Sequence, residues 1–190
     1  MGKTKEWKWG YIKPEGDLAI TPRFDEASDF LDGLGAVKID WARGYIDRSG
    51  EFVINPIFEA AGDFHDGVAV VKLDGETRCI DKDGMFSDKQ PPVETPIFES
   101  GFNPHYEPHD GLVRFVENQK FGYKDIQGNV VIRPQYFEAT DFSEGLACVK
   151  KGKSSLWGYI DTSGRTAIPP GFKQARPFHE GMAAVLSTAD

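Results

Sequence analysis

The sequence repeats itself about every 34 residues, and this period constrains the fold more than any other feature. The segment 44–50, Gly-Tyr-Ile-Asp-Arg-Ser-Gly, has counterparts that begin at Gly10, Arg78, Gly122 and Gly158. A second block, Phe-His-Asp-Gly-Val-Ala at 64–69, follows at a fixed distance, because its glycine lies 17 residues after the last glycine of the first block. The same distance of 17 residues recurs in the units that begin at 10, 122 and 158. Such a period is typical of architectures in which each unit buries its apolar face against its neighbours.

We therefore divide the chain into five units within one repeat domain, residues 1–190. Their approximate bounds are 7–40, 41–74, 75–117, 118–153 and 154–190. The third unit is ten residues longer, because 27 residues separate Gly84 from Gly111 where 17 are usual. Insertions in repeat proteins emerge on one face, which is often the binding face.

The second unit predicts short antiparallel strands. Residues 44–47 are aromatic and β-branched, and a glycine turn joins them to 51–54 as a hairpin. Pro56 predicts that pairing ends there or that this strand lies at a sheet edge. Residues 58–66 lack alternation and predict an irregular connection, whereas 67–72 are apolar and predict a buried third strand. Residues 73–76 predict a hairpin turn into the next unit.

This pattern predicts an all-β fold, a tandem array with about three strands in each unit. Strand signals exclude a helical solenoid of the same period. We favour an open, twisting array over a closed ring resembling a propeller, because propeller blades need about 40 residues and four strands. The end units depart from the pattern, and residues 166–171 predict a disturbed second strand in the last one.

The aligned units resemble the bacterial WG-repeat family, also called KWG repeats. Trp9-Gly10-Tyr11-Ile12 and the segment 157–161, Trp-Gly-Tyr-Ile-Asp, carry the resemblance best, and it extends over residues 7–186. Arg43, Thr77 and Phe121 replace the tryptophan elsewhere, and the third unit also lacks the glycine and the tyrosine. The resemblance implies an interaction module and no particular activity, since fold alone does not define function.

Charge narrows the class of partner. The chain carries a net charge of −8, which argues against nucleic acid and anionic membranes as ligands. It favours a basic protein partner, because opposite potentials speed and orient docking. No secretory signal or apolar run of membrane-spanning length is evident, so we expect a cytoplasmic protein with Cys79 and Cys148 reduced. The cluster 150–153 predicts a solvated turn.

No residue set indicates an enzyme, a metal or another cofactor. One row of carboxylates precedes a glycine in every unit, and a second row follows the first strand; both fit turns whose side chains bond the backbone. These residues are Asp32, Asp66, Asp110, Glu144 and Glu180, and then Asp47, Asp81, Asp125 and Asp161. His105 and His109 have a spacing that could bind zinc on a helix, but Pro104 and Pro108 argue against a helix there. His65 and His179 occupy one repeated position, which reflects the repeat.

Two sets of residues are candidates for binding. The first lies in the insertion and comprises Phe98, Phe102, His105, Tyr106 and His109, which would contact a protein partner. The second is the repeated tyrosine, Tyr11, Tyr45, Tyr123 and Tyr159, which either packs between units or forms a stripe that binds a small ligand or glycan. The sequence therefore predicts a non-catalytic protein-binding module, one form of which is an acidic inhibitor or immunity protein that blocks a toxin. The ligand-binding stripe is the alternative.

Overall fold

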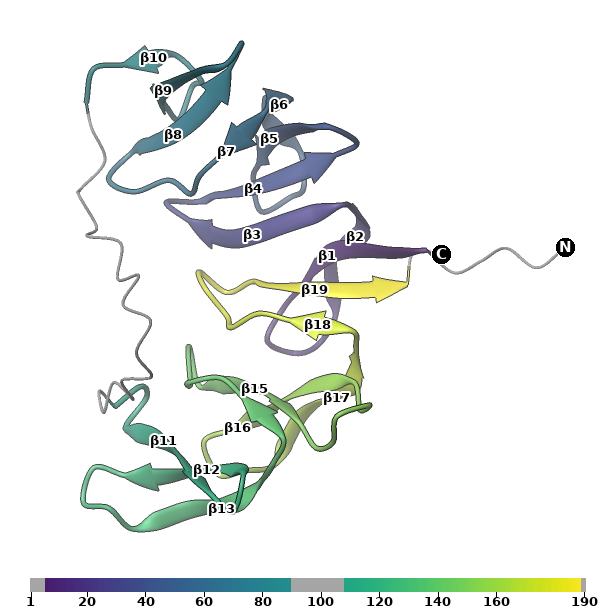
Figure 1. Ribbon diagram of the computed structural model, residues 1–190, viewed down its shortest axis with the longest axis vertical. Coiled ribbons are helices and arrows are strands. Elements are labelled where there is room, and N and C mark those ends of the chain that lie inside the picture. The colour runs from purple at the N-terminus through teal and green to yellow at the C-terminus, as the bar shows by residue number, and fades with distance from the viewer. Residues whose placement is uncertain (1–5, 90–107, 189–190) are drawn as a thin grey trace, which may run out of the picture.

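The computed structural model describes residues 6–89 and 108–188, which form five antiparallel sheets and contain no helix (Figure 1). We label the sheets A to E. Sheet A holds β18 (Gln174–Ala175), β19 (Ala183–Thr188), β1 (Trp7–Ile12) and β2 (Leu18–Phe24). Sheet B holds β3 (Glu26–Leu31), β4 (Leu34–Ile39), β5 (Ala42–Ile46) and β6 (Phe52–Phe58). Sheet C holds β7 (Ala60–Ala61), β8 (Val68–Leu73), β9 (Glu76–Asp81) and β10 (Phe86–Ser87). Sheet D holds β11 (Leu112–Glu117), β12 (Lys120–Asp125) and β13 (Val130–Tyr136), and sheet E holds β14 (Glu138–Ala139), β15 (Leu146–Lys150), β16 (Trp157–Asp161) and β17 (Thr166–Phe172).

Sheets B, C, D and E are each built from two consecutive sequence units, and sheet A is built from the first and the last unit. In sheet B, β3 and β4 belong to the first unit and β5 and β6 to the second, joined by the hairpin from Ile39 to Ala42. Sheet A closes this pattern across the whole chain, because β1 pairs with β19 from Trp7↔Thr188 to Ile12↔Ala183. A complete sheet therefore requires the end of one unit and the beginning of another.

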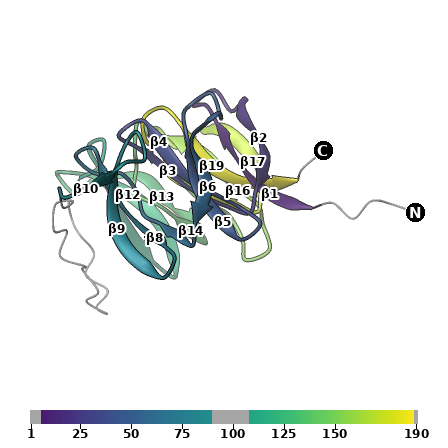
Figure 2. The same ribbon diagram turned by 90° about the horizontal axis from the view of Figure 1, so that it is seen from above.

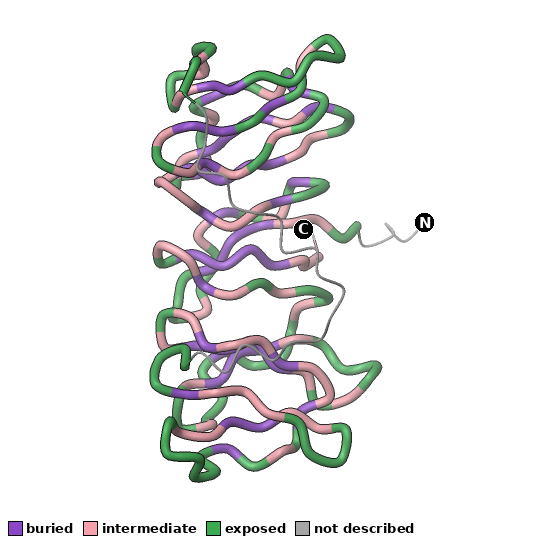
Figure 3. The backbone as a smooth tube through the Cα atoms, turned by 60° about the vertical axis from the view of Figure 1, so that its left-hand side comes forward, coloured by how far each residue is buried: buried purple, intermediate pink, exposed green. Residues whose placement is uncertain are grey.

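The five sheets stack in the order C, B, A, E, D, so the chain begins and ends in the central sheet (Figures 1 and 2). One apolar cluster fills each of the four junctions between neighbouring sheets. The core is thus a series of layers (Figure 3), with exposed residues gathered at the turns. The described sheets leave C and D at opposite ends of the stack, which confirms the open all-β array.

Four prolines at one repeated position, Pro22, Pro56, Pro134 and Pro170, lie inside strands, at a bulge. Strand β6 continues through Pro56 to Phe58, because Tyr45 pairs with Ile54 and Arg43 with Phe58, so two additional residues loop out of β6 between these pairs. Since β6 is the outer strand of sheet B, the missing proline N–H costs no ladder bond. The expectation that pairing ends at Pro56 is therefore wrong, and the edge position is confirmed.

The bulge explains the glycine that precedes each repeated tyrosine. A Cβ at Gly44 would lie 2.5 Å from the Ile54 carbonyl oxygen, and one at Gly10 would lie 2.6 Å from that of Ile20. Real Cβ atoms essentially never come this close to another atom, so the strand that runs beside the bulge requires glycine at this position. In sheet C, Arg78 occupies this position, and β10 ends at the pair Ser87↔Cys79, just before it.

Two other expectations require correction. The connection predicted to be irregular contains a short fourth strand, β7 in the second unit, so a unit has four strands where three were expected. Strand β17 is also regular: its pairs Trp157↔Phe172 and Tyr159↔Ile168 match those of the other units, and Pro169-Pro170 sit in the bulge. The predicted disturbance at residues 166–171 is therefore wrong.

Candidate binding surfaces

The four repeated tyrosines join neighbouring sheets. Each hydroxyl donates a hydrogen bond to a backbone carbonyl 17 residues later, in the next sheet of the stack, at 2.7–2.9 Å. The four pairs are Tyr11 to Ser28, Tyr45 to Gly62, Tyr123 to Thr140 and Tyr159 to Arg176. All four side chains are 0% exposed, and each ring meets a phenylalanine edge to face, as Tyr45 meets Phe64 at 4.8 Å. Burial raises the pKa of each tyrosine, so each hydroxyl keeps its proton.

This geometry leaves no tyrosine ring face open to solvent. The alternative of a stripe formed by Tyr11, Tyr45, Tyr123 and Tyr159 that binds a small ligand or glycan does not agree with it. The physical reason is that a tandem unit cannot bury its own apolar face, so the largest repeated side chain is used to join the sheets. The other interpretation, packing between units, agrees with the structure.

The turn carboxylates form a second connection between sheets. Asp32, Asp66, Asp110, Glu144 and Glu180 all have positive φ of 51–55°, and the glycine after each also has positive φ. The carboxylate then accepts the N–H of the corresponding glycine in the next sheet. Gly145 donates to Asp110 (2.8 Å), Gly181 to Glu144 (2.9 Å), Gly33 to Glu180 (3.0 Å) and Gly67 to Asp32 (2.8 Å). The sequence predicted that these side chains bond the backbone, and the structure shows that the backbone they bond belongs to the neighbouring turn.

The second row of turn carboxylates bonds locally, as the sequence predicted. Asp47 Oδ1 accepts the N–H of Ser49 (2.8 Å) and of Glu51 (3.1 Å), and Asp161 repeats the pattern with Ser163 and Arg165. Hydrogen bonds from the hydroxyls of Ser49 and Ser163 are the main cause that lowers the pKa of Asp47 and Asp161. These aspartates therefore remain ionised in the folded protein.

Both rows lie on one edge of the stack, which we call the turn edge. It comprises ten turns, residues 13–17, 32–33, 47–51, 66–67, 81–85, 110–111, 125–129, 144–145, 161–165 and 180–181. In a sheet of order β3-β4-β5-β6, the turns after β3 and after β5 fall on the same side, and contacts such as Arg48 to Glu180 (2.8 Å) link one sheet's turns to the next. The turn edge thus runs along the whole stack.

The turn edge carries the net negative charge of the protein. It holds thirteen carboxylates, namely Glu15, Asp17, Asp32, Asp47, Glu51, Asp66, Asp81, Asp83, Asp110, Asp125, Glu144, Asp161 and Glu180. Its four basic residues are Lys13, Arg48, Lys82 and Arg165. The remaining seventeen acidic and eighteen basic residues nearly cancel in the full sequence. A surface of one sign therefore follows from the repeated turn chemistry.

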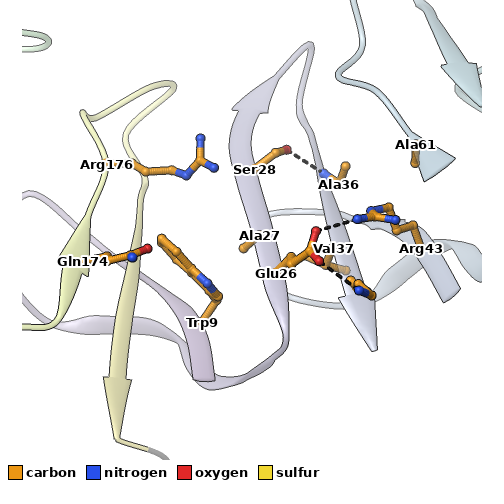
Figure 4. A pocket seen from close by; sticks show the side chains of 11 residues that line it. Trp9, Glu26, Ala27, Ser28, Ala36, Val37, Arg43, Ala61, Gln174 and Arg176 are labelled. Carbon is orange, nitrogen blue, oxygen red and sulfur yellow. Dashed lines mark hydrogen bonds and ion pairs between the residues drawn. The ribbon is translucent and has the colours of Figure 1, made fainter. Parts of the chain in front are cut away.

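A groove lies on the side of the stack that carries the short strands β7, β14 and β18, away from the turn edge. Two hollows of about 340 and 450 Å³ share Trp9, Gln174 and Arg176 and together cross sheets E, A and B. Figure 4 shows the first hollow, where Trp9 and Gln174 face β3 and Glu26 reaches Arg43. We call the two hollows the tryptophan groove. Its charged residues are Lys38, Arg43, Lys150, Lys173, Arg176, Glu26 and Glu138.

The tryptophan groove was not predicted from the sequence. A signal was present, because Trp9, Arg43 and Trp157 occupy the repeated position before the glycine, and Lys38 and Lys150 occupy another repeated position. The groove arises only when sheets E, A and B stand side by side, which requires the pairing of β1 with β19.

The predicted partner-binding residues of the insertion fall mainly outside the described residues. Phe98, Phe102, His105 and Tyr106 belong to the range 90–107. His109 is exposed, and its backbone exchanges two hydrogen bonds with Leu112 at 2.9 and 3.0 Å, as His65 and His179 do at the same position of their turns. Binding by the insertion stays a prediction.

Residues 6–89 and 108–188 contain no group of three metal-ligating side chains, and no helix there could span a membrane. Cys79 and Cys148 are both buried, and burial raises the pKa of Cys148 to about 12. Cys148 is therefore protonated and packs as a small apolar residue.

Comparison with known proteins supports the repeat. A family model described as "WG containing repeat" matches residues 9–40, 44–76, 121–153 and 157–186. No curated protein matches this sequence. A solved structure described as "Crystal structure of the eukaryotic initiation factor" aligns with 94% of this chain and 54% of that chain, at 12% identity and a TM-score of 0.27. This chain thus spans about half of that one, and the TM-score is too low to indicate a shared fold.

Proposed function

Because the chain belongs to the family of proteins with WG-containing repeats, we propose that it is a non-catalytic module that binds another protein through the turn edge. The observation that carries the proposal is the concentration of negative charge on that one edge, across all five sheets. A long surface of one sign steers and orients a partner of the opposite sign. We therefore propose a basic protein partner.

The turn edge is suited to rigid docking. Eight of its thirteen carboxylates are held by backbone hydrogen bonds within a turn, as at Asp47, or between turns, as at Asp32 and Gly67. Their charges are therefore fixed before a partner arrives, and little side-chain entropy is lost on binding. A more specific form of the proposal is an inhibitor or immunity protein, acting in the cytoplasm, that covers the cationic cleft of a toxin.

The test uses carboxylates whose removal leaves the turns intact. Glu15→Gln, Glu51→Gln and Asp83→Asn remove three charges from the turn edge, and no hydrogen bond of the described residues uses these side chains. The matched control, Asp40→Asn, Asp74→Asn and Glu117→Gln, removes three charges from the opposite hairpins. Each tagged protein is used to capture partners from its host, and association rates are measured at several salt concentrations.

We expect a basic partner that the control triple variant binds as fast as the unmodified chain. The turn-edge variant should bind it several times more slowly at low salt, and the difference should shrink as salt screens the charges. A partner that binds both variants equally, or an acidic partner, would contradict the proposal. Protection of cells against a toxin by the unmodified chain, weakened by the turn-edge variant, would support the inhibitor form.

A further inference from the structure

We propose that the tryptophan groove is a second binding site, of opposite sign to the turn edge, which takes an extended peptide segment with one acidic side chain. The groove has five basic residues and two carboxylates on a chain whose net charge is −8. The groove is therefore positively charged, whereas the chain as a whole is negatively charged. It is independent of the proposed role of the turn edge.

The two carboxylates of the groove lie toward its ends and are already paired. Glu26 binds Lys38 at 2.9 Å and Arg43 at 2.6 Å, and Glu138 lies 3.8 Å from Lys150. Lys38 and Arg43 are the main cause that lowers the pKa of Glu26, so that carboxylate is ionised. These pairs leave the ends of the groove with little net charge.

The centre of the groove contains two cations, Arg176 and Lys173, that form no ion pair with either carboxylate of the groove. Arg176 belongs to both hollows; its guanidinium carbon lies 5.6 Å from the centre of the Trp9 ring, and Nη1 is 4.0 Å from Asp29, the limit for an ion pair. Lys173 lines the second hollow, and its ammonium lies 5.3 Å from the centre of the Trp7 ring. A ligand carboxylate placed here gains two cations, and a planar guanidinium can bind it through two parallel hydrogen bonds.

The floor of the groove is apolar and rigid. Ala27, Ala36 and Val37 line the first hollow and are nearly fully buried, while Trp9 and Trp157 form half-buried walls. The backbone at Arg176 is fixed at the sheet junction, because its carbonyl accepts the Tyr159 hydroxyl at 2.9 Å. Such a preformed surface suits an extended chain that places apolar side chains on either side of its carboxylate.

The stack sets the spacing of the ligand. Packed sheets lie about 10 Å apart, and an extended peptide in the polyproline II conformation rises about 3.1 Å per residue with three residues per turn, so side chains three residues apart face the same way and reach neighbouring junctions. The carboxylate should therefore lie three residues from an apolar side chain on either side. A single-stranded nucleic acid fits less well, since its phosphates would also meet Glu26 and Glu138.

The probe is the synthetic peptide Gly-Ser-Leu-Gly-Ser-Glu-Gly-Ser-Leu, titrated into the ¹⁵N-labelled full chain. The indole N–H signals of Trp9, Trp157 and Trp41 report separately; Trp41 is 77% exposed on the hairpin between β4 and β5, outside the groove. Trp9→Phe, Trp157→Phe and Trp41→Phe identify these three signals among those of the four tryptophans. We expect saturable shifts at Trp9 and Trp157 and none at Trp41.

Three comparisons make the test decisive. Arg176→Gln should raise the dissociation constant at least tenfold, whereas Arg165→Gln, which removes the same charge from the turn edge, should leave it unchanged; melting curves confirm that both variants fold. A peptide with Lys in place of Glu should not bind. The proposal is overturned if the Lys peptide binds equally, if Arg176→Gln has no effect, if no shift occurs at millimolar peptide, or if oligothymidylate competes for the groove and binds more tightly than the peptide.

Discussion

At the residue scale, the repeated tyrosine hydroxyl has a measurable role. Tyr45→Phe keeps the buried ring but leaves the Gly62 carbonyl without its donor at the junction of sheets B and C. We expect a loss of about 1 kcal/mol in the free energy of unfolding, the usual net contribution of a hydrogen bond, because Gly62 is exposed and water can replace the lost donor. Urea denaturation measures it. Tyr136→Phe is the matched control, because Tyr136 occupies the position of Phe24 and Phe58 and its ring is equally buried; an equal loss in both variants would contradict the role of the hydroxyl.

Asp29 is a residue whose charge opposes folding. Burial raises its pKa despite the neighbouring Arg176 and His179, while Asp63 adds to the increase, and Oδ1 is buried without a hydrogen-bond partner among the described residues. An acid whose folded pKa is raised destabilises the protein above its unfolded pKa and has no effect once both states are protonated. Asp29→Asn should therefore raise the melting temperature at pH 7 and leave it unchanged near pH 3. An increase of the same size at both pH values would show that charge is not the cause.

At the element scale, the glycine at the bulge is the position where a single methyl group has the largest effect. Gly44→Ala places Cβ 2.5 Å from the backbone of Ile54, so β5 or β6 must move. We expect a loss of about 3 kcal/mol in unfolding free energy, the upper range for overpacking. Arg78→Ala is the matched control at the same repeat position in sheet C, where no long second strand follows among the described residues, and it should cost far less. Equal losses in calorimetry would contradict the close approach at the bulge.

The elements differ in how far the sequence could predict them. Strands such as 44–47 and their turns were predictable, because β-branched residues, Asp and Gly determine local conformation. The sheets were not, since a sheet joins two units and sheet A joins β1 to β19, a contact that no local pattern encodes. Arg78 and Cys79 were visible as departures from the repeat, and the structure gives their consequence. Sheet C lacks the tyrosine that would join it to a further sheet. The tryptophan groove was not predictable either, because it depends on the pairing of β1 with β19.

At the scale of the whole molecule, we expect the length of the third unit to matter, because its chain must connect the two end sheets. Sheets C and D lie at opposite ends of the stack, and about 10 Å between packed sheets makes the distance about 40 Å. The chain from 90 to 107 has 18 residues, and at up to about 3.6 Å per residue it can span about 60 Å. Eight residues would span less than about 30 Å.

Deleting ten residues from this range should therefore disrupt the stack. We expect one end sheet to undock, seen as faster hydrogen exchange in β9 or β11 and a lower midpoint in urea. The control replaces the same ten residues by a Gly/Ser sequence of equal length, which keeps the span and removes the side chains. A stack that keeps its exchange protection after the deletion would show that the length is not required.

The central position of both chain ends also determines the order in which the protein can be completed during synthesis. Strand β1 leaves the ribosome before every other described strand, and its partner β19 leaves after all of them. Sheets B, C, D and E can each pair within a short stretch of nascent chain, whereas sheet A must wait for β18 and β19. Among the described strands, β1 is thus the one with a backbone edge that stays open longest, because it can pair early with β2 on one side only, and a chaperone that acts on the nascent chain would find an unpaired strand edge there until β19 arrives.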